Sequence, residues 1–148
     1  MSAQIDSTPA MLFLLNLGSF GTIGHFKEVS GIDHETEVIE DKKVLPDGKL
    51  ATYRVAGVIK WSPIEMKRGI DTSGDLWKWR ETVIQQGQAA ARLDGEISLI
   101  NLLGAPVATW KFINGWPSKY TGAAFNANNN EVAMEGITII HEGVERVL

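Results

Sequence analysis

The chain has 148 residues, a formal net charge of −4 and no cysteine. Its length predicts one domain spanning residues 1–148, and the lack of cysteine excludes disulfides and thiolate metal sites. Lysine and arginine form no basic cluster, which argues against direct nucleic-acid binding. The sequence has no apolar run of about 18 residues and no signal-peptide layout, so we expect no membrane insertion and synthesis in the cytoplasm.

The first expected elements are short strands. Residues 11–17 (MLFLLNL) form an apolar run that is too short for a core helix and predicts a strand buried on both faces. A glycine-rich turn follows at residues 18–24, and its spacing differs from the dinucleotide-binding fingerprint. Further strands are expected at residues 25–29 and 35–39.

The segment 40–52 (EDKKVLPDGKLAT) combines many charges with Pro-Asp-Gly turn chemistry. One interpretation is a solvated loop. The other is a docking loop, because long loops in compact domains are often functional. Its candidate contact residues are Asp41, Lys42, Lys43, Leu45, Asp47 and Lys49.

The middle of the chain predicts two more strands and a helix. Alternation over residues 53–61 predicts one strand, and residues 64–68 resume extended structure after Pro63. Residues 71–73 offer N-caps for a helix over 74–86, which Gly87 terminates. The apolar stripe of this helix comprises Leu76, Trp79, Arg80, Val83 and Ile84. Trp79 is therefore expected in the core, whereas Trp77 is a candidate for an exposed partner contact or for the core edge.

The last third predicts a half-buried strand and its partners. From residue 92 to 98 the chain alternates, with Arg92, Asp94, Glu96 and Ser98 on the polar face. Residues 107–113 are expected to pair with it. An aromatic-rich crossover over 114–120 then leads to a last strand within 130–143. Together these elements predict a mainly β fold of two packed antiparallel sheets, a sandwich or open barrel, with one flanking helix.

Residues that could support catalysis are sparse. The three histidines (His25, His34 and His141) lack the spacing of a zinc site, and we expect each on a surface or strand face. Glu131 and Glu135 lie four apart and could form a hydrolase carboxylate pair, but two acids on a solvated face are far commoner. We therefore predict no enzyme activity, no cofactor and no metal site.

Several stretches of the sequence jointly resemble the tail tube proteins of contractile phages and phage-like injection systems. They are residues 24–32 (GHFKEVSGI), residues 57–70 (GVIKWSPIEMKRGI), residues 76–79 (LWKW), Trp116-Pro117 and residues 131–135 (EVAME). Their order and spacing carry the resemblance. One departure is Ala56, which stands before Gly57 where the family pattern has proline.

The resemblance implies hexameric rings that stack into a hollow tube inside a contractile sheath. Its further implied partners are baseplate and spike proteins, with DNA or a protein payload in the lumen. The implied location is an assembled tail or injection particle made in a bacterium and released from it in some systems. Segment 40–52 would then be a ring-stacking loop, and the polar face of residues 92–98 would line the lumen or, alternatively, the exterior. The competing hypothesis is a small β-sandwich module that binds a ligand or carbohydrate through exposed tryptophans.

Overall fold

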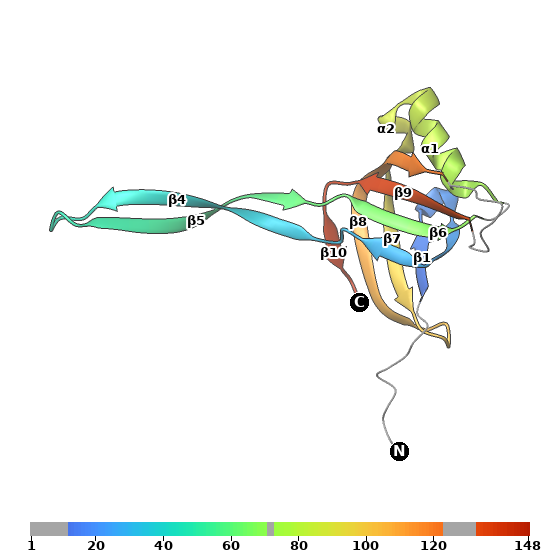
Figure 1. The fold of residues 1–148 in the computed structure, drawn as a ribbon, viewed down its shortest axis with the longest axis horizontal. Helices are drawn as coiled ribbons and strands as arrows, with labels where there is room; N and C mark the ends of the chain where they lie inside the picture. The colour runs from blue at the N-terminus through green and yellow to red at the C-terminus, as the bar shows by residue number, and fades with distance from the viewer. Residues whose placement is uncertain (1–11, 71–72, 123–132) are drawn as a thin grey trace, which may run out of the picture.

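The computed structural model describes residues 12–70, 73–122 and 133–148. Most of them form a β-rich body, from which one long hairpin projects (Figure 1). The strands are β1 (Leu12–Asn16), β2 (Thr22–Phe26), β3 (Glu28–Ser30), β4 (His34–Val44), β5 (Leu50–Trp61), β6 (Ile64–Gly69), β7 (Leu93–Ile100), β8 (Pro106–Thr121), β9 (Met134–Ile140) and β10 (Val144–Arg146). The helices are the 3-10 turn η2 (Gly18–Phe20), α1 (Asp75–Gln86) and α2 (Gln88–Ala91).

Within the described residues, eight strands of the body are hydrogen bonded in the order β2-β1-β7-β8-β9-β6-β3, with β10 also paired to β8. Strand β8 belongs to both halves of the body. Residues 106–115 pair with β7 and residues 116–121 pair with β9, all antiparallel. The two halves fold against each other around this shared strand. The predicted fold of two packed antiparallel sheets with a flanking helix is confirmed.

Strand β8 bends at Asn114 and Gly115. Asn114 has a left-handed φ of +50°, and its backbone N–H donates to the Asp94 carboxylate at 3.0 Å. A Cβ on Gly115 would lie 2.3 Å from the ring of Phe112, so a larger residue here would collide with that buried ring. The bend lets one strand pass from the first sheet to the second.

The core fills the space between the sheets and under α1. Trp79 is fully buried, and its indole N–H donates to the carbonyl of Ala91 at 2.9 Å, which ties α1 to α2. The other fully buried apolar side chains in the described part of the chain are Leu15, Leu17, Ile23, Phe26, Ile64, Met66, Leu76, Ala91, Ile97, Phe112 and Ile139. Most of these positions lie on strands of both sheets, so each sheet buries one face, and Leu76 and Ala91 add the contacts of α1 and α2.

The helix predicted over 74–86 is confirmed as α1, which ends at Gly87. Gly87 has a φ of +90°, and its N–H bonds to the Val83 carbonyl. The N-cap is Gly74, so the predicted cap within residues 71–73 is wrong, although Asp71 and Thr72 lie outside the described residues. Ile84 was expected on the buried stripe but is 64% exposed, because Leu76, Trp79 and Val83 already cover the contact with the body.

Three strand predictions need correction. Strand β1 lies between β2 and β7, but Leu12 is exposed because one face of this sheet is open to solvent. The strand expected at 25–29 divides into β2 and β3 at Lys27, where the chain passes from one sheet to the other. The crossover expected over 114–120 is a continuation of β8, and the register shift beside Pro117 accommodates its missing N–H.

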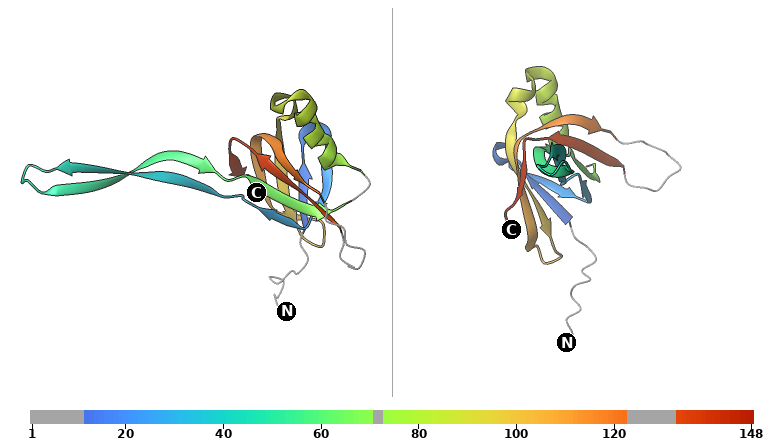
Figure 2. Two further views of the ribbon diagram at one scale, coloured as in Figure 1. Left: turned by 45° about the horizontal axis from the view of Figure 1, so that its top comes forward. Right: turned by 90° about the vertical axis from the view of Figure 1, so that its left-hand side faces the viewer.

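The largest correction concerns segment 40–52. Apart from the turn at residues 45–49, it is paired strand, and β4 with β5 forms a hairpin that we name the arm. Glu40 lies opposite Arg54, and Val44 lies opposite Leu50. The loop prediction is wrong because cross-strand pairing satisfies the backbone of these charged residues as well as water would. The right-hand view of Figure 2 looks along the arm and shows it as a twisted ribbon.

Candidate assembly surfaces

The tip of the arm is a compact turn. The Leu45 N–H bonds to the Lys49 carbonyl at 2.7 Å, and the Gly48 N–H bonds to the Leu45 carbonyl at 2.9 Å. The Asp47 carboxylate accepts the Lys49 N–H at 3.0 Å, and Gly48 takes a φ of +84°. The predicted Pro-Asp-Gly turn is therefore confirmed. These hydrogen bonds give the end of the arm a defined turn conformation.

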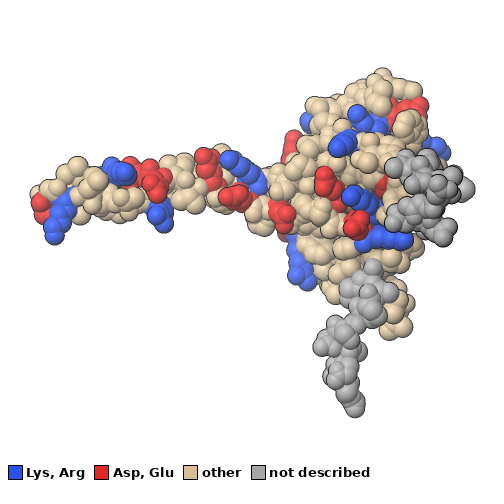
Figure 3. All heavy atoms as spheres, viewed as in Figure 1, with Lys and Arg blue, Asp and Glu red and all other residues tan. Residues whose placement is uncertain are grey.

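The charges of the arm pair with one another along its length. Glu40 lies 3.6 Å from Arg54, Asp41 lies 3.7 Å from Lys43, and the Lys43 ammonium sits 5.7 Å from the centroid of the Tyr53 ring. All these groups are exposed, and such pairs add little stability. Figure 3 shows both signs of charge distributed along the arm with uncharged surface between them. These exposed charges favour solubility of the arm but contribute little to its conformational stability.

The arm also exposes large apolar side chains. At its end, Val44 and Leu50 form a cross-strand pair and are 73% and 62% exposed. Further exposed apolar residues along the arm are Val38, Ile39, Tyr53, Val55, Val58 and Ile59. An isolated two-stranded hairpin is marginally stable in water, and exposed apolar edges promote association. The arm therefore needs a partner surface.

A buried histidine anchors the root of the arm. The His141 Nε2 lies 2.9 Å from the Ser62 carbonyl oxygen, and Nδ1 accepts the Gly143 N–H at 3.1 Å. The neutral ring with its hydrogen on Nε2 satisfies both partners. Trp61, the last residue of β5, packs against the rings of both His34 and His141. His141 is thus a buried structural residue, and its expected place on a surface or strand face is wrong.

The subunit is expected to lose stability in mild acid through His141. Burial lowers the pKa of His141 below its usual 6.5, although the bond to the Ser62 carbonyl partly offsets this. A proton on Nδ1 would also place a donor against the Gly143 N–H. Since the folded pKa lies below the unfolded one, the unfolded state binds more protons as pH falls through 6.5, so stability is complete above that pH and declines below it.

Urea unfolding of the subunit at pH 7.5 and at more acidic values measures this effect. The His141→Gln variant should show a weaker loss between neutral and acidic pH than the unaltered chain. His25 is exposed on β2, so His25→Gln is the matched control and should behave like the unaltered chain. Equal pH profiles for all three proteins would contradict the assignment.

A cavity of about 320 Å³ lies beside the root of the arm, and we name it the root cavity. Its apolar lining comes from Trp61, Ile113 and Val144. Three charged residues surround this lining: Lys111, Glu142 and Glu145. The residues belong to β5, β8 and β10 and the turn before β10, so no local sequence pattern predicts the site. Sequence reasoning missed it.

The polar face predicted over 92–98 lies on β7 and on Arg92 directly before it. Arg92, Asp94 and Glu96 are exposed, as the alternation predicted, and Ser98 is half-buried with its hydroxyl 3.0 Å from that of Thr109. Strand register extends this face sideways into a polar row across four neighbouring strands. The row is Asn16 on β1, Glu96 on β7, Lys111 on β8 and Glu145 on β10. The structure thus aligns these four polar side chains in one row across the sheet.

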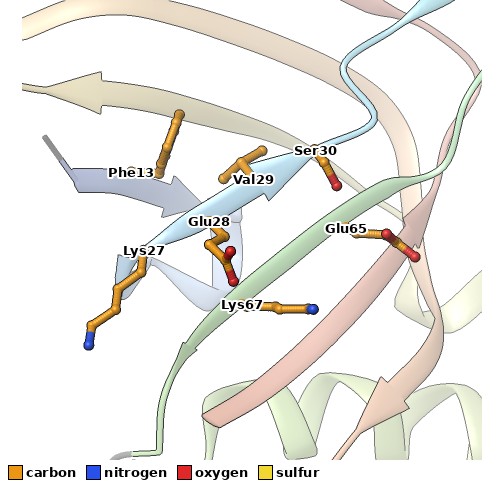
Figure 4. Close-up of a pocket in the computed structure, with 7 residues that line it drawn as sticks. All are labelled: Phe13, Lys27, Glu28, Val29, Ser30, Glu65 and Lys67. Atoms are coloured by element: carbon orange, nitrogen blue, oxygen red, sulfur yellow. The ribbon is translucent and has the colours of Figure 1, made fainter.

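A second cavity of about 320 Å³ opens between β1 and the β3–β6 pair (Figure 4). Phe13 on β1 and Val29 and Ser30 on β3 line it. Four charged side chains, two of each sign, surround it: Lys27, Glu28, Glu65 and Lys67. Figure 4 shows the two lysines pointing in different directions, so they do not converge on one anion.

Glu135 is buried rather than solvated. It lies opposite Arg68 in the β6–β9 ladder, and its carboxylate is 3.2 Å from the guanidinium. The Tyr120 hydroxyl donates to the other oxygen at 2.8 Å. Burial and the bond to Glu135 raise the pKa of Tyr120 to about 12. Glu131 lies outside the described residues, and the engaged Glu135 is not available as a hydrolase carboxylate.

Trp77 is 52% exposed, and its ring packs edge-on against Tyr120 at 5.2 Å. It therefore sits at the edge of the core, beside the partly buried Tyr120. The described part of the chain holds no group of three or more His, Asp or Glu side chains placed to bind a metal ion. Among the described helices, none has the length and apolar character needed to cross a membrane.

A β-rich body with a projecting arm whose apolar side chains lack cover is the architecture of a subunit that assembles. Residues 9–145 match the family described as T4-like virus tail tube protein gp19, and the chain belongs to this family. The resemblance inferred from the sequence is confirmed, and the chain is a structural protein of a tail tube.

Solved structures agree with this assignment. One chain of an extracellular contractile injection system, the PVC sheath–tube complex in its extended state, is 25% identical with a TM-score of 0.78. The similarity covers 99% of this chain and 98% of that one. A chain of the anti-feeding prophage cap is also 25% identical, with a TM-score of 0.77 and coverage of 99% and 93%.

A more distant structure shares the fold alone. Hcp1 from Flavobacterium johnsoniae is 17% identical with a TM-score of 0.55, and the similarity covers 92% of this chain and 94% of that protein. A search of curated protein sequences found no match.

Proposed function

We propose that this chain forms hexameric rings that stack into the hollow inner tube of a contractile injection particle or phage tail. The observation that carries the proposal is the arm, an exposed hairpin with an apolar tip on a body that belongs to the tail tube family. Heterologous contacts of this kind close into rings or extend without limit, depending on their geometry. Both outcomes are needed to build a tube from one chain.

The arm is the proposed ring-stacking element. Its candidate contact residues are Asp41, Lys42, Lys43, Leu45, Asp47 and Lys49, and all of them lie at or near the tip. The rigid turn and the exposed charges support specific contacts there. The apolar pair Val44 and Leu50 adds surface that gains by burial.

The polar face of β7 is the proposed wall of the lumen. Arg92, Asp94, Glu96 and Ser98 line it, and exposed acids outnumber bases among them. An acidic wall repels nucleic acid, so DNA would pass without adhering, and a protein payload would meet a wet, polar surface. The exposure of this face and the polar row beside it support the assignment. The alternative places the same face on the exterior, against the sheath.

The proposed partners are other copies of this chain, a sheath protein, and baseplate and spike proteins. The structures that resemble this chain include a sheath–tube complex and a tube-terminating cap of injection particles. We propose that the chain is made in the bacterial cytoplasm and acts in the assembled particle, which is released in some systems. This chain carries no catalytic role in the proposal.

Electron microscopy of the purified protein at high concentration tests the proposed function. We expect rings with six-fold symmetry and stacked tubes with an open lumen. A map of the tube also locates Asp94 and Glu96. Monodisperse monomers at high concentration would contradict the tube, and acids on the outer wall or between subunits would contradict the lumen assignment alone.

A further inference from the structure

The end of the arm and the root cavity have matching apolar surfaces. Val44 and Leu50 face each other across the hairpin and are largely exposed. The root cavity has an apolar lining of Trp61, Ile113 and Val144, and Ile113 is 43% exposed. Two branched side chains are of the size that a cavity of about 320 Å³ accepts.

The charges around the two surfaces also match. The tip carries three lysines against two aspartates: Lys42, Lys43 and Lys49, with Asp41 and Asp47. The cavity rim carries two glutamates against one lysine: Glu142 and Glu145, with Lys111. The excess of positive charge on the tip therefore meets an excess of negative charge at the rim. Such complementarity guides association and fixes register.

The two surfaces cannot meet within one molecule. The arm extends away from the body, and the views in Figures 1 and 2 agree that its tip lies at the far end from its root. Strand β4 has 11 residues, which corresponds to an arm of roughly 36 Å. A second copy displaced by about that length along the arm would bring its root to the first copy's tip.

We propose that the root cavity of one copy receives the arm tip of a second copy, so that tip-to-root contacts link successive rings. This inference rests on the proposed tube function and names the acceptor for the ring-stacking arm. Every copy carries one tip and one root cavity, so the contact is heterologous and repeats along the tube. The cavity lies where the polar face meets the arm root, so a tip seated there would occupy the rim of the proposed lumen wall.

The absence of cysteine from the chain permits a direct test by crosslinking. In a Leu50→Cys/Val144→Cys variant, each copy carries one thiol at the tip and one at the cavity. Mild oxidation of its tubes should give a ladder of covalent dimers, trimers and higher multimers on a denaturing gel. Each single-cysteine variant should give no ladder beyond dimers.

The matched control is Leu50→Cys/Leu103→Cys. Leu103 is 91% exposed on the turn between β7 and β8, away from the root of the arm. Its tubes should give no ladder under the same oxidation. If the Leu103 pair gives the ladder and the Val144 pair does not, the acceptor site is wrong.

A second variant tests the contact without cysteine. Ile113→Lys places a charge in the exposed part of the cavity lining and should shorten tubes at least tenfold while the subunit stays folded. Ile84→Lys changes an isoleucine on α1 that is 64% exposed and lies outside the cavity lining, and it should leave tube length unchanged. Tubes of normal length from Ile113→Lys would overturn the inference while leaving the tube function in place. Failure of the unaltered chain to form any tubes would overturn both.

Discussion

Replacing Trp79 with alanine is expected to lower the free energy of unfolding of the subunit by about 3–5 kcal/mol. The side chain is fully buried between α1 and the sheets, and its indole N–H holds the carbonyl of Ala91. The substitution leaves a large cavity and an unpaired carbonyl, and both effects destabilise the fold. Urea unfolding of the disassembled subunit measures the change.

Trp77 supplies a matched control on the same helix. Its side chain is half-exposed and its ring packs edge-on against Tyr120, so Trp77→Ala should cost no more than about 1 kcal/mol. An unchanged midpoint for Trp79→Ala, or equal losses for the two variants, would mean that the two faces of α1 are assigned the wrong way round.

Shortening the arm is expected to abolish long tubes while the subunit remains folded. Residues 42–52 can be replaced by Asn-Gly, because Asp41 and Tyr53 are paired and a two-residue turn can join them. The shortened protein loses the tip and its apolar pair but keeps the arm root and the complete core. Electron microscopy should then show single rings or short stacks in place of long tubes.

The control for the shortened arm is the integrity of the subunit itself. Its circular dichroism in the near ultraviolet and its thermal midpoint should stay close to those of the unaltered chain, because none of the removed residues belongs to the core cluster. Tubes of normal length from the shortened protein would rule out the arm as the stacking element.

Much of the fold was predictable because burial imposes local periodicity. The alternation over residues 92–98 predicted β7, and the apolar stripe with Gly87 predicted α1 and its end. In both elements one face contacts the core, so the hydrophobic pattern records the secondary structure directly. The sequence stretches that resemble tail tube proteins fall largely on such elements and their connections.

The arm could not be predicted in this way. Both of its faces meet solvent in the single subunit, so apolar and charged residues do not segregate along it. Under the proposed stacking, the order of apolar and charged residues on the arm matches a surface on a second copy of the chain. The burial of Glu135 could not be predicted for a different reason. Its partner Arg68 is 67 residues away in the sequence and becomes adjacent only when β6 and β9 pair.

The root cavity was also beyond the reach of the sequence. Its apolar lining comes from three strands that meet at one corner of the body: Trp61 on β5, Ile113 on β8 and Val144 on β10. The sequence around each of these residues shows no motif of a binding site. The polar face of β7 was found because its residues are neighbours in one strand. Its extension across β1, β8 and β10 depends on register, which single-strand patterns do not specify.

Because β4 and β5 are paired along the arm, its length can change only in fixed steps if the apolar pair at its tip is to keep the same orientation. Adding one residue to each strand would move the tip by about 3.4 Å but turn its apolar pair to the opposite face, because side chains alternate along a strand. Adding two residues to each strand would restore the face and lengthen the arm by about 7 Å. Under tip-to-root docking, related tubes would differ in the spacing between their rings by whole steps of this size.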